Sequence, residues 1–144
     1  MKISTRGRYG IRLLIDLAEH AGESHVPLAS VAERKGISIR YLEQVAVILR
    51  RSGFIRSVKG ASGGYALTRS PRDIMIGDVL RELEGDMLVV DPPLPDIMES
   101  RIQRCIRTTI FDRMNDGIAQ VIDKKTLSEV VCATDSEESY MYFI

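Results

Sequence analysis

The stretch that decides the fold is residues 28–68, LASVAERKGISIRYLEQVAVILRRSGFIRSVKGASGGYALT, in which two helical patterns precede a strand, a glycine-rich tip and a second strand. Pro27 precedes the first helical pattern, as proline often does at a helix start. Gly36 ends that pattern at a position where a left-handed residue is needed. Ser38 then stands where a side chain can cap the second helix. These residues predict two short helices joined by a glycine turn.

The second helix has two different faces. Its apolar positions follow the i, i+3, i+4, i+7 spacing of one buried face: Leu42, Val45, Ala46 and Leu49. The opposite face carries side chains that can reach base edges and phosphates: Ser38, Arg40, Tyr41, Glu43, Gln44, Arg50 and Arg51. One face is therefore expected in a core, and the other is free to contact a partner.

A β-hairpin is expected after this helix, because residues 54–58 and 65–68 have the pattern of short strands. The tip between the strands offers four candidate contacts to DNA: Lys59, Gly60, Ser62 and Gly63. Glycines permit positive backbone angles and a close approach to a phosphate backbone. The whole pattern predicts a mainly α fold with a small β-hairpin wing, which is a winged helix-turn-helix, and it makes DNA the first candidate ligand.

The formal net charge of zero hides two opposite halves. Residues 1–72 hold thirteen Lys and Arg against five Asp and Glu, a net charge of +8, while residues 73–144 hold seven against fifteen, a net charge of −8. A solvated basic surface could explain the bias by itself. Its location on a winged helix-turn-helix favours nucleic-acid binding, with affinity supplied by phosphate contacts.

Length and composition limit the other classes. A chain of 144 residues can bury one core, or a small domain with an oligomerisation arm. No apolar run approaches the roughly 20 residues of a membrane span, and the N-terminus lacks the apolar core of a signal peptide, so a cytoplasmic protein is expected. Cys105 and Cys132 are far apart and are expected to be reduced thiols. No catalytic or metal-ligand spacing stands out, so neither enzyme activity nor a metal site is predicted.

Three regions are expected along the chain: a DNA-binding domain (1–85), a proline-rich linker (86–95), and a dimerisation helix with a C-terminal tail (96–144). The first region should begin with a helix that braces the helix-turn-helix and should close with a helix over 76–83. The bracing helix is expected to be capped by Ser4 or Thr5 and to end at Gly22, with this inward stripe: Ile11, Leu14, Ile15 and Ala18.

The pattern from Asp96 to about Lys124 is helical, which corresponds to roughly 40 Å of helix. One stripe of this long helix is apolar: Ile102, Ile106, Ile110, Met114, Ile118, Val121 and Ile122. Packing within the chain could cover the stripe, but a helix tethered by a linker favours a second subunit. A homodimer would set two recognition helices about 34 Å apart, which suits a palindromic duplex.

Three stretches resemble the CymR/IscR family of bacterial winged helix-turn-helix transcriptional regulators: MKISTRGRYG (1–10), ISIRYLEQ (37–44) and VKGASGGY (58–65). The resemblance covers most of the chain. It implies a dimeric transcription factor whose long helix crosses the dimer mate. It also implies four DNA-contacting positions: Tyr41, Glu43, Gln44 and Lys59.

The family resemblance implies two kinds of sensing. Iron–sulfur members bind a cluster through three cysteines between the wing domain and the long helix, and through a histidine shortly after the last cysteine. Here that region offers Cys105 alone, with Thr108 where the histidine would stand, so a cluster is not assigned, although carboxylates could substitute. Cys105 is interpreted as an apolar position on the helix stripe, and Cys132 as a buried thiol.

The C-terminus is closest to the family branch that represses cysteine metabolism. TLSE (126–129), TD (134–135) and the final YMYFI (140–144) resemble the tail of that branch, in which the repressor acts with cysteine synthase. A terminal isoleucine carboxylate suits an enzyme site that binds the carboxylate of an amino-acid substrate. The candidate partner-binding residues are Tyr142, Phe143 and Ile144. Packing of the aromatic tail on the protein's own dimer surface is the alternative.

The expected function is therefore a dimeric DNA-binding repressor of cysteine or sulfur metabolism genes that acts with cysteine synthase. A regulator that senses through a cluster or a thiol is one alternative. A protein-interaction adaptor that uses the same fold without DNA contact is another, because a fold does not determine its function.

Overall fold

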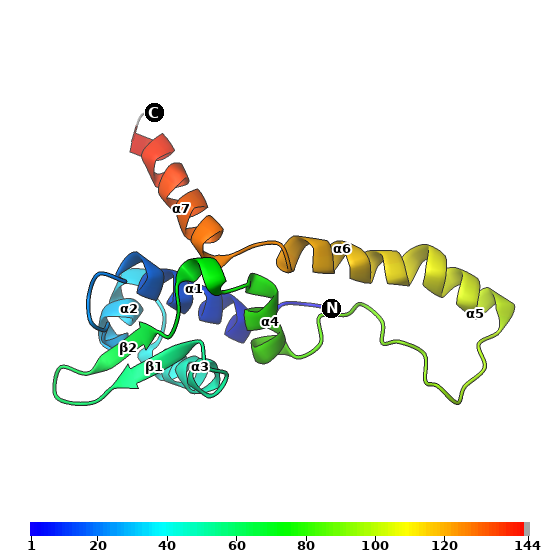
Figure 1. The fold of residues 1–144 in the computed structure, drawn as a ribbon, viewed down its shortest axis with the longest axis horizontal. Coiled ribbons are helices and arrows are strands. Elements are labelled where there is room, and N and C mark those ends of the chain that lie inside the picture. The colour runs from blue at the N-terminus through cyan, green and yellow to red at the C-terminus, as the bar shows by residue number, and fades with distance from the viewer. Residues whose placement is uncertain (143–144) are drawn as a thin grey trace.

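The computed structural model describes the backbone of residues 1–142 and the side chains of residues 1–137. Its elements follow in this order: α1 (Thr5–Glu19), α2 (Leu28–Lys35), α3 (Ile39–Arg51), β1 (Ile55–Val58), β2 (Gly64–Leu67), the 3-10 turn η1 (Pro71–Asp73), α4 (Ile76–Glu84), α5 (Arg101–Ile106), the π-helical segment η2 (Arg107–Phe111), α6 (Asp112–Ile122) and α7 (Leu127–Tyr142). The fold is mainly helical with one antiparallel hairpin, as predicted. Figure 1 shows a body made of α1 to α4 and the hairpin, from which the helix α5–η2–α6 extends to one side.

The helix-turn-helix forms as the sequence predicts. Gly36 follows α2 in the left-handed conformation, with φ of 63°, and its N–H donates to the carbonyl of Ala32. Ser38 occupies the N-cap position of α3, but its side chain makes no capping hydrogen bond, so the predicted role of that hydroxyl was wrong. The start of α3 is secured by the Ser38 carbonyl instead, which accepts from the N–H of Tyr41 at 3.1 Å and of Leu42 at 3.0 Å.

The hairpin is closed by four residue pairs, from Ile55 with Leu67 to Val58 with Gly64. Val26, which lies between α1 and α2, adds a third short strand position: its N–H and carbonyl exchange 2.8 Å hydrogen bonds with Tyr65. Gly64 is required here because a Cβ would run into the backbone of Val26 and Pro27. The wing is therefore joined to the body through β2 as well as through the chain.

Helix α1 is more deeply buried than its predicted stripe implies. It ends at Glu19 rather than Gly22, and its inward face is centred on Leu13, Leu14 and Leu17. Of the predicted stripe, Leu14 is buried, while the others are only partly buried: Ile11, Ile15 and Ala18. The stripe shifted because α1 touches α2, α3, α4, α7 and β2, so a wider arc of the helix is covered than one amphipathic face.

A charged residue also lies inside this helix. Asp16 is fully buried and accepts two hydrogen bonds from Arg34 of α2, at 2.9 and 2.7 Å. These bonds, with the coulombic attraction of Asp16, raise the pKa of the Arg34 guanidinium. Removing one partner of such a pair leaves a buried charge uncompensated, which costs far more than the pair itself contributes. The pair joins α1 to α2.

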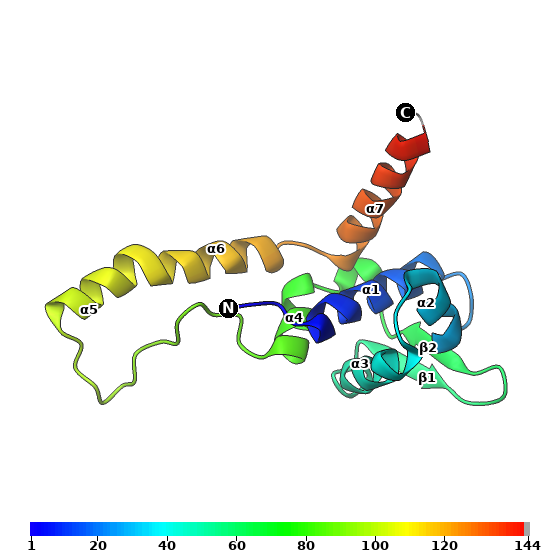
Figure 2. The ribbon, with the colours of Figure 1, turned by 180° about the vertical axis from the view of Figure 1, so that it is seen from behind.

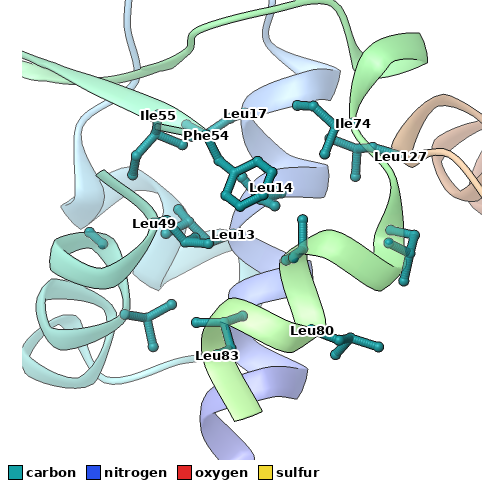
Figure 3. Packing of buried hydrophobic residues seen from close by; sticks show 14 of the residues in the cluster. Leu13, Leu14, Leu17, Leu49, Phe54, Ile55, Ile74, Leu80, Leu83 and Leu127 are labelled. Carbon is teal, nitrogen blue, oxygen red and sulfur yellow. The ribbon is translucent and has the colours of Figure 1, made fainter. Parts of the chain in front are cut away.

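One hydrophobic core holds the body together (Figure 3). It is formed by residues from α1, α3, the hairpin, α4 and the first residue of α7, among them Leu14, Leu49, Ile55, Leu83 and Leu127. Burying each such side chain stabilises the fold by roughly 1.5–3 kcal/mol. The core therefore makes the start of α7 part of the body.

Helix α4 packs closely on the N-terminal half of α1. Gly7 and Gly10 have no room for a Cβ, which would run into Glu84 and Leu83 respectively. Glu84 Oε1 uses this space to accept from the Ser4 N–H at 3.1 Å, the Ser4 hydroxyl at 2.6 Å and the Gly7 N–H at 2.9 Å. A carboxylate is thereby placed at the positive end of the α1 dipole. This contact explains both glycines of the motif MKISTRGRYG.

The segment from Gly85 to Glu99 has no helix or strand and runs outward from the body beneath the long helix, as Figures 1 and 2 show. Asn115 of α6 holds it near its start, accepting from the Val89 N–H at 2.7 Å and donating to the Val90 carbonyl at 3.2 Å. The helix begins at Arg101 rather than at the predicted Asp96, because Ser100 and Gln103 form a capping box there.

The continuous helix α5–η2–α6 covers residues 101–122, which corresponds to about 33 Å. Its C-terminal end is tied to α4 by Arg81, whose guanidinium donates to both carboxylate oxygens of Asp123, at 2.6 and 2.8 Å. These hydrogen bonds lower the pKa of Asp123. Its N-terminal end lies far from the body in both views. The division of the chain at residues 85 and 95 remains a prediction.

Helix α7 begins on the body and then leaves it (Figure 1). Thr126 and Glu129 form a capping box: the Thr126 N–H donates to Glu129 Oε2 at 2.7 Å, and the Glu129 N–H donates to Thr126 Oγ1 at 3.2 Å. The hydrogen bond from the Thr126 backbone is the main cause that lowers the pKa of Glu129. Since Leu127 is buried in the core, this box fixes the direction in which α7 departs.

Replacing Glu84 with Ala should destabilise the body by about 1–3 kcal/mol, because three donors at the start of α1 lose their acceptor. Glu84→Gln keeps one acceptor oxygen and should lose less. Urea unfolding measures both, with Glu33→Ala, an exposed change on α2, as the control. An unfolding midpoint for Glu84→Ala equal to that of the control would contradict this role.

Candidate nucleic-acid interface

The predicted contact face of α3 is open. Its buried face is complete, since Leu42, Val45, Ala46 and Leu49 have no exposed surface. The opposite face is exposed at five of the candidate positions: Ser38, Arg40, Glu43, Gln44 and Arg50. Because the core holds the first face, the second is fixed in direction and cannot rotate away. This face can present hydrogen-bond donors and acceptors to the edges of bases.

Tyr41 differs from its neighbours on α3 because it is only partly exposed. Its ring packs edge-on against Tyr9 of α1, with ring centroids 5.2 Å apart and an angle of 80° between the rings. The Arg12 guanidinium lies over the other ring, 5.4 Å from the Tyr9 centroid. Such contacts are favourable and limit the rotamers of Tyr41. Tyr41 therefore sits at the edge of the α3 face in a fixed orientation.

The wing and α3 share one groove of about 400 Å³. Glu43 lines it from α3, and Ser57, Lys59, Gly60 and Gly63 line it from the hairpin. Two stretches that were singled out separately in the sequence are thus brought to one surface. Arg50 lies near the other end of α3 and is not part of this groove's lining.

The wing tip needs its glycines. Gly60 has φ of 123°, which a residue with a side chain rarely adopts. The Gly63 N–H donates to the Gly60 carbonyl at 3.0 Å and closes the turn, and a Cβ on Gly63 would run into the carbonyls of Val58 and Gly60. The turn leaves Lys59 and Ser62 exposed. The backbone of such a compact tip can closely approach the surface of a binding partner.

The predicted dimer stripe is largely uncovered in the single chain. Ile102 is 72% exposed and Ile110 49%, and Ile106, Met114 and Val121 are also exposed. Ile118 and Ile122 are the exceptions, since Ile118 is partly buried against the core of its own chain and Ile122 belongs to that core. An apolar groove of about 520 Å³ runs along the same side and is lined by residues from the N-terminus, α4 and α6: Met1, Ile3, Leu80, Met87, Met114, Gly117, Ile118, Val121 and Ile122.

The region where a cluster would be expected contains an ion-pair network. The Arg107 guanidinium donates to both oxygens of Glu99, at 2.7 and 2.8 Å, and to Asp112 at 2.8 Å. These hydrogen bonds lower the pKa of Glu99 and raise that of Arg107. Glu99 ends the irregular segment and Arg107 lies on the helix, so the network fastens one to the other beside a cavity of about 320 Å³.

Both thiols are exposed in the described part of the chain. The interpretation of Cys132 as buried was therefore wrong: it lies on a side of α7 that its own chain does not cover. Within residues 1–137, the one group of three His, Cys, Asp or Glu side chains with ligand atoms within 4.8 Å of one another is Asp16, Glu19 and His20, and Arg34 already occupies its buried carboxylate. Cys105 belongs to no such group in this part of the chain.

The tail residues proposed for a partner lie at the limit of the structure. Tyr142 is the last residue of α7, and its side chain is not described; Phe143 and Ile144 lie outside the described residues. None of the helices built from residues 1–142 combines the length and apolar character that a membrane crossing needs.

Two residues near this interface were missed in the sequence. His25 contacts the wing tip, and Asp16 is buried beneath α2. A lone Asp within an apolar run was a usable signal, since an unpaired buried carboxylate is rare and points to a basic partner. His25 carried no comparable signal, because the contact depends on how the hairpin folds back.

Comparisons with known proteins agree with the interpretation of this surface as a nucleic-acid interface. The family model described as Rrf2, iron-dependent transcriptional regulator, matches residues 3–133. The chain is similar to the HTH-type transcriptional regulator CymR of Bacillus subtilis, 38% identical over 145 residues and the full length of both chains. It is also similar to IscR of Pectobacterium atrosepticum, 35% identical over 91% of this chain and 79% of that protein.

A solved structure agrees with the sequence relatives. The structure of CymR, named the global cysteine regulator of B. subtilis, superimposes with a TM-score of 0.79 and 37% identity over 92% of this chain and 98% of that one. These relatives are transcriptional regulators rather than enzymes, which agrees with the prediction that this chain is not an enzyme. The chain belongs to the Rrf2 family of transcriptional regulators.

Proposed function

We propose that this regulator binds a palindromic operator as a homodimer, with α3 in the major groove and the wing on the adjacent backbone. The observation that carries the proposal is the shared groove, in which Glu43 of α3 and Lys59 of the wing lie on one surface of the basic half of the chain. Base edges are read by hydrogen bonds, and affinity comes from phosphate contacts. The DNA-contacting residues in this proposal are Ser38, Arg40, Tyr41, Glu43, Gln44, Arg50, Lys59, Gly60, Ser62 and Gly63.

The long helix supplies the dimer in this proposal. Its stripe leaves several large apolar side chains exposed along about 33 Å of helix, which is unusual for a surface that stays in water. The adjoining groove of about 520 Å³ is apolar and open. A second copy related by a two-fold axis would cover the stripe of each chain with the other. The residues assigned to the dimer are Ile102, Ile106, Ile110, Met114, Ile118 and Val121.

We infer that the genes under control belong to cysteine or sulfur metabolism and that the regulator represses them. The support is the full-length similarity to CymR, whose solved structure is named for cysteine regulation. The similarity to relatives named IscR supports an iron–sulfur regulator as the alternative function. The cysteine-metabolism interpretation is favoured because Cys105 is the one cysteine between the wing domain and the end of the long helix.

The partner in this proposal is cysteine synthase, which would bind the segment after the described side chains of α7. The capping box at Thr126 and the burial of Leu127 direct α7 away from the body (Figure 2). A partner could then occupy Tyr142, Phe143 and Ile144 without covering the α3 face. Through this complex, the state of cysteine synthase would affect the binding of the regulator to its operator.

DNA binding should depend steeply on salt, with log affinity falling linearly against log salt concentration as counterions leave the phosphates. Lys59→Ala should weaken binding to many sequences alike and reduce the salt slope, while Glu43→Ala should change base preference by about 1–3 kcal/mol per base pair. Fluorescence anisotropy with labelled palindromic duplexes measures both. Glu33→Ala, on the exposed side of α2, is the control. An affinity for DNA that does not change with salt concentration would contradict the proposal.

The dimer should depend on the stripe. Ile110→Glu would place an unpaired carboxylate in the apolar contact and should release monomers, at a cost of several kcal/mol. Gln120→Glu puts the same carboxylate on an exposed position of α6 outside the stripe and should leave the dimer intact. Sedimentation velocity separates the two species. A protein with Ile110→Glu that stays dimeric at micromolar concentration would rule out this interface.

The complex with cysteine synthase should be lost when the aromatic tail is changed. Tyr142→Ala with Phe143→Ala removes apolar area that a partner site would enclose, so calorimetry should detect no binding. Glu137→Ala, one turn earlier on α7, is the control. O-acetylserine, a substrate of that enzyme, should dissociate the native complex if the tail enters the substrate site. If the double variant binds cysteine synthase as the native protein does, the tail does not contribute to the complex. That outcome would leave the DNA-binding proposal unaffected.

A further inference from the structure

A histidine outside the α3 face reaches the tip of the wing. His25 lies in the segment between α1 and α2, and its Nε2 is within hydrogen-bond distance of the Ser62 carbonyl oxygen, 37 residues further along the chain. On its other side, Nδ1 is 2.8 Å from the hydroxyl oxygen of Ser24. The ring is half-buried, so it is held between its own loop and the tip.

The hydrogen-bond chemistry assigns the proton on this ring. A carbonyl oxygen can only accept, so Nε2 must carry the hydrogen that it donates to Ser62. Nδ1 of the neutral ring then accepts from the Ser24 hydroxyl, which can donate or accept as required. Every polar atom in this short chain of contacts is therefore satisfied. The arrangement needs a donor at the position of Nε2 but no charge.

The contact between His25 and Ser62 lies in the wing tip, where the two strands of the hairpin are no longer paired. The last paired residues are Val58 and Gly64, and the exchange between Val26 and Tyr65 secures β2 one residue after Gly64 but not the tip itself. Beyond that point, the tip is held by the turn bond from Gly63 to Gly60 and by His25. Val26 follows His25 directly, so one short segment fastens both strand β2 and the tip of the wing to the body.

We propose that His25 is a positioning residue for DNA binding, which acts by holding the wing tip in the conformation that meets the phosphate backbone. The proposal rests on the function proposed above, in which Lys59 of the wing contacts DNA. Ordering a free loop on binding costs conformational entropy, and a tip that is already ordered avoids that cost. His25 itself does not contact DNA in this role.

The first test compares two substitutions of similar size. His25→Leu removes the donor and should weaken binding to a palindromic duplex by about 2- to 10-fold per wing, the range expected for one hydrogen bond. His25→Gln places an amide N–H near the position of Nε2 and should restore most of the affinity. Both should keep the thermal midpoint of the native protein. A Gln variant that binds as weakly as the Leu variant would contradict the proposal.

The second test asks whether His25 acts through the wing. In a double-mutant cycle, His25→Leu should cost much less affinity in a Lys59→Ala background, because the tip it positions has already lost its cation. Fully additive losses would overturn the proposal. His20→Gln is the matched control, since His20 Nδ1 bonds the Asp16 carbonyl within α1 and does not reach the wing.

The outcomes also separate this inference from the function on which it rests. Native protein that does not bind duplex DNA would defeat the proposed function itself. Native binding that Lys59→Ala weakens and His25→Leu leaves unchanged would overturn the positioning role alone. Native binding that Lys59→Ala does not change would contradict the Lys59 contact on which the role of His25 rests.

Discussion

The close packing of α4 on α1 is the constraint on which the rest of the structure depends. It places the side chains of Glu84 and Leu83 where a Cβ at positions 7 and 10 would lie, and it allows Glu84 to bind the free N–H groups at the start of α1. Without this approach the core side chains of α4, such as Leu83, could not reach α1. Because α1 also contacts α2, α3, α7 and the hairpin, its placement sets the position of the recognition helix and of the wing together.

The elements that could be predicted from sequence are those with strong local signals. The buried positions of α3 repeat at helical spacing, Gly36 and Gly85 mark helix ends, and glycines mark the wing tip, so these features appear in the structure as expected. The stripe of α1 could not be predicted in the same way, because a helix surrounded on most sides has no single apolar face.

Other features were missed in the sequence: one local signal and several contacts between residues far apart in the chain. The helix start at Arg101 was predicted five residues early because the capping box of Ser100 and Gln103 was not recognised. The His25 contact and the Asp16–Arg34 pair join residues far apart in the chain, and local spacing says nothing about them. Exposure of Cys132 likewise depends on where α7 leaves the body. The residues proposed to bind DNA remain predictions, and the structure adds that α3 and the wing tip share a groove.

The placement of α1 also connects the two ends of the proposed mechanism. Helix α7 begins in the core through Leu127 and packs on α1, and the chain that leaves the C-terminal end of α1 supplies His25 and Val26 to the wing. A close-packed interior transmits a displacement rather than absorbing it. In the proposed function, a protein bound at the end of α7 would therefore act on a helix whose other contacts position α3 and the wing. In the proposed function, the partner and the DNA occupy separate surfaces joined by α1, so the regulator would hold both at once.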